Sequence, residues 1–276
     1  MNSLITNIQR MCFQDGPGIR TTIFLKGCTI RCPWCSNPEN ICFEAENYNI
    51  SADCVLKYPL CRKDACDYYG RQCSAVGVYG KSYSKDELIK KLIEDETYYR
   101  QSGGGVTFSG GEPLAHLDAL LPVMRSLKER GVHLAIETAL FVPKDKVIRA
   151  LNFVDFIYVD VKILKPESCM EILGGNVETF LANVDAILQS DKDIIFRVPC
   201  NDTYTLKNEN MDALLDFFRD KKEVPIEIFK THNLGEKKYR SLGLTVEKSI
   251  ECSDKRFEFF FQRIKEQGNI VTIQNI

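Results

Sequence analysis

Long apolar runs and a charge imbalance of either sign are both missing from this sequence. Its 276 residues carry 36 lysines and arginines against 38 aspartates and glutamates, a formal net charge of -2. Such a balance gives no reason to expect a nucleic-acid or membrane-surface partner. No apolar stretch approaches the roughly 20 residues that cross a bilayer, and the first residues lack the apolar core of a secretory signal. We therefore expect a cytoplasmic protein with no nucleic-acid and no membrane partner.

Cysteine, in contrast, is abundant and unevenly placed. Nine of the twelve cysteines precede residue 74. Because thiols stay reduced in the cytosol, a cluster of this kind indicates metal binding rather than disulfides. The other interpretation is a set of scattered buried cysteines, which pack as small apolar side chains.

Strand-like and helix-like segments alternate beyond residue 84. Ser84 and Glu87 have the spacing of a capping box at the start of a helix, and a later helix should stop at Gly131. The alternation predicts a parallel sheet with right-handed crossovers, and near-continuous apolar strands fit burial on both faces. The expected strands cover about six segments: 21–26, 105–110, 132–138, 153–162, 193–199 and 224–230.

Six such units can form an open doubly wound sheet or an incomplete barrel, and either places the functional site at the carboxyl ends of the strands. Residues 41–82 interrupt the alternation with many polar residues and few periodic apolar ones. We interpret them as a small insert after the first strand, short for a core of its own without a metal. The expected organisation is a main domain of residues 1–40 and 83–276 with a cysteine-rich insert of residues 41–82.

The first cysteine group lies directly after the first expected strand. Cys28, Cys32 and Cys35 have the spacing C-x3-C-x2-C, and three close thiolates bind a soft metal or an iron–sulfur cluster. A structural zinc site is closed by four ligands. A cubane [4Fe-4S] cluster held by three cysteines leaves one iron open to a small molecule. Trp34 lies inside this loop, either limiting solvent access to a cluster or simply packing.

These motifs together resemble a known family. DGPGIRTTIFLKGC, the C-x3-C-x2-C loop and GGGVTFSGGEP closely resemble the activating enzymes of glycyl radical enzymes, within the radical S-adenosylmethionine (SAM) superfamily. The resemblance covers roughly residues 5–245, and WCSNPE is most similar to members with an added ferredoxin-like insert. It implies an α/β fold, a partial (β/α)6 TIM-like barrel with a small cysteine-rich ferredoxin-like insertion after the first strand.

The resemblance also implies the chemistry. Cys28, Cys32 and Cys35 would hold a [4Fe-4S] cluster whose open iron is chelated by SAM. One electron cleaves SAM to methionine and a 5′-deoxyadenosyl radical, which abstracts the α-hydrogen of a glycine in a partner glycyl radical enzyme. A flavodoxin or ferredoxin-type protein would donate the electron. The alternatives are a radical SAM enzyme acting on a small molecule or a maturing peptide, and a zinc-stapled binding module without enzymatic activity.

The family motifs also indicate which residues would bind the cofactor. The SGGEP stretch meets the amino group of SAM in the family, and the ends of the next two strands bind a monovalent cation and the cofactor's carboxylate. Glu137 replaces the family's aspartate at the cation position. The expected cofactor-binding residues are Trp34, Ser36, Gly110, Gly111, Glu112, Glu137, Thr138, Asp160, Lys162, Arg197 and His232. The segments PESCMEILGGN and VPCNDTY depart from the family's pattern in loops expected to meet the protein substrate.

The second cysteine group gives a weaker signal. Cys54, Cys61, Cys66 and Cys73 are spaced x6, x4 and x6, with Cys42 earlier and no C-x2-C pair. Two further clusters would need about eight cysteines. One auxiliary [4Fe-4S] cluster with an electron-relay role, a zinc site that stabilises the small insert, and unligated cysteines all remain open.

Overall fold

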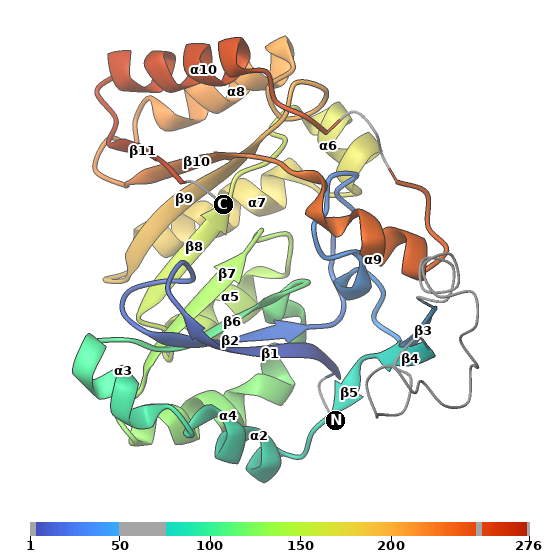
Figure 1. The fold of residues 1–276 in the computed structure, drawn as a ribbon. Coiled ribbons are helices and arrows are strands. Elements are labelled where there is room, and N and C mark those ends of the chain that lie inside the picture. The colour runs from blue at the N-terminus through green and yellow to red at the C-terminus, as the bar shows by residue number, and fades with distance from the viewer. Residues whose placement is uncertain (1–3, 50–75, 247–249, 275–276) are drawn as a thin grey trace.

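The computed structural model describes residues 4–49, 76–246 and 250–274. Within these ranges a nine-stranded sheet runs through the molecule in the order β11-β10-β9-β8-β7-β6-β2-β1-β5 (Figure 1). Neighbouring strands are parallel from β2 to β11, whereas β1 and β5 pair antiparallel. The strands are β1 (Leu4–Cys12), β2 (Arg20–Leu25), β5 (Lys81–Ser82), β6 (Gly105–Gly110), β7 (His133–Thr138), β8 (Phe156–Asp160), β9 (Asp193–Cys200), β10 (Ile226–Lys230) and β11 (Val271–Ile273).

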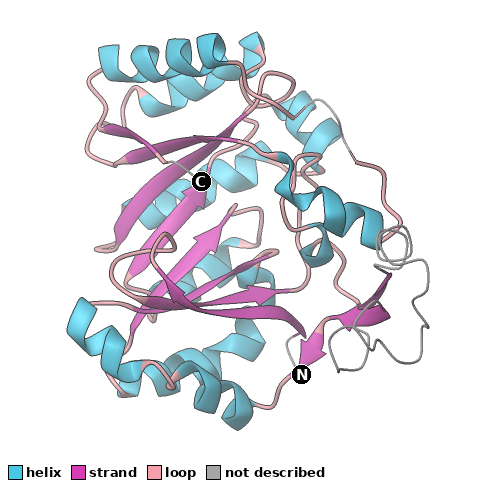
Figure 2. Cartoon of the chain, viewed as in Figure 1, coloured by secondary structure: helices cyan, strands magenta, loops and turns pink. Residues whose placement is uncertain are grey.

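Helices cover the outer side of this curved sheet (Figure 2). They are α2 (Lys85–Leu92), α3 (Glu96–Ser102), α4 (Leu117–Glu129), α5 (Lys144–Leu151), α6 (Pro166–Leu173), α7 (Val177–Leu188), α8 (Asn208–Phe218) and α10 (Asp254–Glu266). The short helix α9 (Glu236–Ser241) lies instead against the turn η1 (Pro38–Asn40), and the other short turns are η2 (Pro113–His116) and η3 (Asn233–Gly235). Among the described residues, no helix combines the length and the apolarity needed to cross a membrane.

The expected parallel strands are confirmed. β2 and β6 to β10 match the six expected segments and lie side by side in chain order, which is the arrangement of a partial (β/α)6 barrel. Local signals fix the helix ends. The backbone N–H of Ser84 donates to Glu87 at 2.8 Å, completing the capping box of α2. Gly131, with φ +73°, follows the end of α4.

The sheet and helices enclose a large apolar core, and Ala135, Phe156 and Tyr158 form a second, smaller cluster. Strand residues such as Phe108 and Phe196 pack with helix residues such as Phe180 and Phe218, and all four are 0–1% exposed. Parallel strands buried on both faces need this continuous apolar cover, so the strand ends are the places where charged side chains can reach a cavity.

The chain before the first parallel strand holds a feature that the alternation did not indicate. β1 runs antiparallel to β2, and Ile8 pairs with Ile23.

A second, two-stranded sheet joins β3 (Glu46–Asn49) to β4 (Val76–Tyr79), with Asn49 opposite Val76. The chain ends on either side of residues 50–75 therefore meet. Cys54, Cys61, Cys66 and Cys73 lie outside the described residues, so the expectations for this insert stay predictions.

Arg20 closes the amino-terminal end of the barrel. It is fully buried, and its guanidinium donates to Thr107 Oγ1 at 2.6 Å, to the Val106 carbonyl at 2.9 Å and to the Pro17 carbonyl at 2.9 Å. Burial lowers the pKa of Arg20 to about 10. The buried charge is tolerated because several acceptors surround this planar group. Arg20 thus joins β2, β6 and the turn before β2.

The substitution Arg20→Lys should destabilise the fold. A lysine cannot reach all three acceptors, so we expect the free energy of unfolding to fall by about 2–4 kcal/mol. Urea denaturation followed by circular dichroism measures the change. The control is Arg100→Lys at a side chain that is 71% exposed, where about 0.5 kcal/mol or less is expected. Equal effects at the two positions would contradict the role given to Arg20.

Candidate functional site

A cavity of about 300 Å³ lies where the carboxyl ends of the parallel strands meet. Side chains at or just after the ends of β6 to β10 line one side, and the cysteine loop that follows β2 lines the other. The expected site residues among its lining are Cys28, Cys32, Trp34, Cys35, Ser36, Gly110, Gly111, Glu137, Asp160, Lys162, Arg197 and His232. The structure therefore brings together residues that are far apart in the sequence.

The cysteine loop is fixed by its backbone. Gly27 N–H donates to the Asn40 carbonyl at 2.9 Å, and Cys28 N–H donates to the Ile41 carbonyl at 3.0 Å. The loop is also tied to α6, since Arg31 N–H donates to the Leu173 carbonyl at 2.9 Å. These bonds hold the thiols in place through the main chain and leave the sulfur atoms available.

The three thiols suit a polynuclear cluster. Burial raises the pKa of Cys28 to about 12 and raises the pKa values of Cys32 and Cys35, while Lys162 opposes the rise at each. Thiolates here therefore need a positive partner such as bound metal, whose binding releases protons. In a cubane [4Fe-4S] cluster each of these thiolates would bind a different iron.

Two glycines in SGGEP let this loop lie against the cysteine loop. A Cβ on Gly111 would fall 2.1 Å from the Gly27 carbonyl oxygen, and one on Gly110, whose φ is +109°, would fall 2.2 Å from the Leu25 nitrogen. The approach is made by hydrogen bonds from Gly111 N–H to the Leu25 carbonyl and from Glu112 N–H to the Gly27 carbonyl, both 2.8 Å. The glycines thus permit close backbone contact besides lining the cavity.

Glu112 and Thr138 lie behind the cavity wall and are not part of its lining. Glu112 is fully buried and accepts hydrogen bonds from Thr138 Oγ1 at 2.8 Å, Ala139 N–H at 3.0 Å and Leu114 N–H at 3.1 Å. Burial raises the pKa of Glu112 to about 7 against the pull of these three donors. Its carboxyl group thus links the SGGEP loop to the end of β7.

Each acidic side chain in the cavity wall has a basic partner. Lys162 Nζ donates to Asp160 at 2.7 Å, and Arg197 Nη1 donates to Glu137 at 2.8 Å. Burial alone would lower the pKa of Lys162, but Asp160 together with the nearby Cys32 and Cys28 outweighs it, and the net shift is upward. Burial raises the pKa of Glu137, opposed by Arg197. The cavity is therefore charged but internally paired, as partly buried charges require.

Arg197 is held from several directions. Its Nε donates to Glu227 at 3.1 Å, its Nη2 donates to the Gln14 carbonyl at 2.7 Å, and its guanidinium carbon lies 3.4 Å from the centre of the Tyr158 ring. A planar cation with contacts on its edge and face has one orientation. Arg197 thereby ties the turn after β1 to the ends of β7 and β10.

The remaining wall is aromatic and comes partly from the C-terminal third of the chain. Trp34 is 5% exposed and packs against Tyr204 with ring centres 5.3 Å apart. Lys238 of α9 donates to Glu39 and Asn37, each at 2.6 Å, and so fastens α9 to the end of the cysteine loop. His232 precedes η3, and its Nδ1 accepts from Leu234 N–H at 3.3 Å.

Sequence reasoning missed several members of the site. The additional lining residues are Ile30, Asn37, Ser109, Ala139, Pro199, Phe229 and Thr231. Ser109, Pro199 and Phe229 each lie near the carboxyl end of an expected strand, which is a signal that could have found them. Glu227 lies two residues before Phe229 in β10, and nothing in the sequence alone connects it to Arg197.

Comparisons with known proteins agree with this geometry. A family model described as a 4Fe-4S single cluster domain matches residues 14–168. The benzylsuccinate synthase activating enzyme of Thauera aromatica is 31% identical over 99% of this chain and 93% of its own. The pyruvate formate-lyase 2-activating enzyme of Escherichia coli (strain K12) is 35% identical over 87% and 81%. The fold is similar to that of a radical SAM methyltransferase from Sphaerobacter thermophilus, with a TM-score of 0.59 at 13% identity over 98% and 76%.

The substitution Gly111→Ala should displace the cysteine loop. The added methyl group would overlap the Gly27 carbonyl, so we expect less iron per chain after reconstitution and a loss of about 2 kcal/mol or more of stability. The control is Gly243→Ala, where φ is +71° but nothing lies within 4 Å of the added Cβ. That variant should lose about 1 kcal/mol and keep its iron. Full iron in Gly111→Ala would refute the steric role.

Glu112 should make the stability of the cluster-free protein depend on pH. Its pKa is about 7 in the fold against an ordinary value of 4.5. Between pH 4.5 and pH 7 the Glu112 carboxyl group is ionised in the unfolded chain but protonated in the folded chain. The contribution of Glu112 to stability is therefore greatest below pH 4.5 and falls by about 3 kcal/mol up to pH 7. Urea denaturation at several pH values should show a flatter profile for Glu112→Gln. The exposed control Glu129→Gln should keep the wild-type slope, and equal profiles for all three proteins would contradict the prediction.

Proposed function

The chain belongs to the radical SAM activating enzymes of glycyl radical enzymes, and from this premise we propose that its 300 Å³ cavity is where the radical chemistry occurs. One observation supports this most strongly. The thiols of Cys28, Cys32 and Cys35 line the same cavity as side chains from the ends of successive parallel strands.

We assign Cys28, Cys32 and Cys35 as the ligands of the [4Fe-4S] cluster. The soft donor set of three thiols lining one cavity fits this group. Together the bound cluster and SAM supply a carbon-centred radical that abstracts a hydrogen atom from the substrate.

The chain's own residues orient and shield that chemistry. Gly110 and Gly111 present backbone at the cavity, next to the cysteine loop. Asp160 with Lys162, and Glu137 with Arg197, provide paired charges that can bind a zwitterionic amino-acid group without leaving a charge unpartnered. Trp34 and Phe229 exclude water from the wall.

Glu112 and Thr138 have a supporting role in this proposal. Their side chains hold the SGGEP loop against the end of β7. A monovalent cation stays a prediction; Glu137 and Asp160 already accept from Arg197 and Lys162, so such an ion would share these carboxylates with the two basic side chains.

The substrate we propose is a glycine of a glycyl radical enzyme. The relatives are named as activating enzymes of benzylsuccinate synthase and of a pyruvate formate-lyase, which are two different partner enzymes. We further propose a flavodoxin or ferredoxin-type electron donor and a cytoplasmic location, where the thiols stay reduced.

For the insert we propose one auxiliary cluster bound by Cys54, Cys61, Cys66 and Cys73. The pairing of Asn49 with Val76 supports a separate unit, because it brings the two ends of this segment together. The proposed domains remain residues 1–40 and 83–276 for the barrel and 41–82 for the insert.

The activity is tested with the reconstituted, reduced protein. With SAM and a candidate glycyl radical enzyme it should release methionine and 5′-deoxyadenosine and produce a glycyl radical doublet in the electron paramagnetic resonance spectrum. The triple variant Cys28→Ala/Cys32→Ala/Cys35→Ala should lose all of these products while keeping its circular dichroism. Product formation by this variant, or no cleavage of SAM by the wild type, would refute the proposal.

Iron analysis of the same triple variant tests the insert. If the insert binds an auxiliary cluster, the variant should keep about four irons per chain after anaerobic reconstitution. Zinc in place of iron would favour the zinc site, and neither metal would indicate unligated cysteines.

A further inference from the structure

The first strand of the sheet has an open edge. β1 pairs with β2, with register shifts between Ile5 and Asn7 and between Gln9 and Cys12, but on its other side it pairs with β5 only at Leu4 and Ile5. Within the described part of the chain, residues 6–12 therefore lack a strand neighbour on this side. An open edge presents N–H and C=O groups that can pair with another extended chain.

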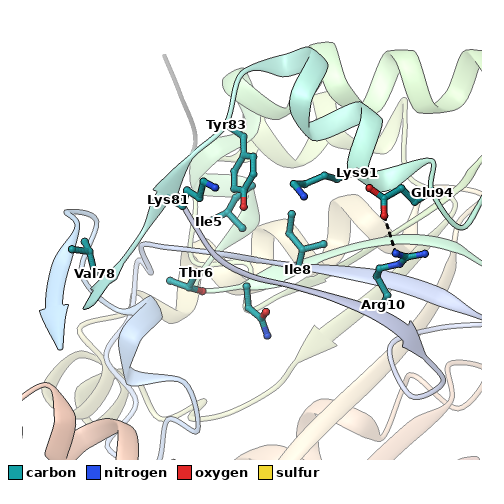
Figure 3. A pocket seen from close by; sticks show the side chains of 10 residues that line it. Ile5, Thr6, Ile8, Arg10, Val78, Lys81, Tyr83, Lys91 and Glu94 are labelled. Carbon is teal, nitrogen blue, oxygen red and sulfur yellow. Dashed lines mark hydrogen bonds and ion pairs between the residues drawn. The ribbon is translucent and has the colours of Figure 1, made fainter. Parts of the chain in front are cut away.

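A hollow runs along this edge. It has a volume of about 530 Å³ and is bounded by β1 on one side and by β4, β5 and α2 on the other (Figure 3). Ile8 and Val78 give it apolar surface, and Val78 is 59% exposed. Val78 lies at one end and Arg10 at the other, and Tyr83 stands beside Ile5 between them. The hollow is thus an elongated groove beside unpaired backbone, on elements that do not line the cysteine cavity.

The charges of this groove are unequal. Its lining contains three cations, Arg10, Lys81 and Lys91, and one carboxylate, Glu94. Arg10 is engaged by Glu94 at 2.8 Å and by the buried Asp95 at 2.7 Å. Lys81 and Lys91 make no ion pair with any described residue, and Figure 3 shows both side chains at the groove.

The neighbouring acid does not satisfy these lysines. Glu87 feels the charge of both Lys81 and Lys91, but Ser84 holds its carboxylate in the cap of α2. Among the described residues, these two exposed ammonium groups beside an open strand edge therefore have no carboxylate within ion-pair distance. That combination fits an extended segment whose backbone pairs with β1 and whose side chains are acidic.

We propose that the edge of β1 and its groove bind an extended acidic polypeptide segment of a partner protein by strand addition. Backbone pairing with residues 6–12 gives the alignment, apolar side chains of the segment face Ile8 and Val78, and acidic ones face Lys81 and Lys91. Edge-to-edge pairing of two copies of this chain is disfavoured, because it would bring like charges together.

The test uses the full-length protein and a fluorescein-labelled synthetic peptide in which glutamate alternates with valine. Fluorescence anisotropy should show binding, and the variant Lys81→Glu/Lys91→Glu should weaken it about tenfold or more. The matched control Lys222→Glu/Lys255→Glu makes the same charge change at exposed lysines on the opposite side of the molecule, next to β10 and on α10. It should leave the affinity within about twofold of wild type.

Two further measurements separate strand addition from simple charge attraction. A peptide with N-methylated backbone amides keeps its charges but cannot pair fully, so it should bind about tenfold more weakly or not at all. Hydrogen–deuterium exchange with the unmodified peptide should slow the amides of residues 6–12. Equal binding of the methylated peptide, or protection elsewhere, would overturn the proposal. No binding would also overturn it, leaving the lysines as charges that keep other strands away from the edge.

Discussion

The contact between the cysteine loop and the SGGEP loop is the constraint on which the rest of the site depends. Two backbones approach so closely at Gly27 and Gly111 that no side chain fits between them. Hydrogen bonds from Gly111 and Glu112 to the end of β2 then set how far the thiols lie from the other strand ends. A parallel sheet supplies the common edge, but this contact determines that a single cavity forms there.

The polar groups around the cavity follow one rule, which is that each buried charge has a nearby partner. Asp160 is matched by Lys162 and Glu137 by Arg197, while Glu112 has donors but no cation and instead has a raised pKa. Paired groups hold their positions without depending on solvent. A ligand entering the cavity therefore meets side chains whose orientations are already set.

Much of this arrangement follows from the sequence because it rests on local and periodic signals. The six parallel strands, the cap at Ser84 and the cysteine loop all follow from patterns within short windows. β1 was missed because an edge strand needs few apolar residues, and Asn7, Gln9 and Arg10 hide its alternation. Glu112 was expected among the cofactor-binding residues, whereas its carboxyl group accepts from Thr138 and from two backbone N–H groups; a carboxylate after two glycines can face a ligand or its own backbone, and the sequence does not distinguish the two. Glu227 meets Arg197 only through the pairing of β9 with β10.

The bonds that fasten the cysteine loop also bear on when the site can form. Lys238 reaches Glu39 across 199 positions of the sequence, and Arg197 reaches the Gln14 carbonyl across 183. On the ribosome the cysteines emerge long before these partners exist, and contacts of such long range form only once the intervening chain has folded. The nascent chain thus exposes its thiols before it can enclose them, and the cavity can be completed only after Arg197 and Lys238 have been synthesised.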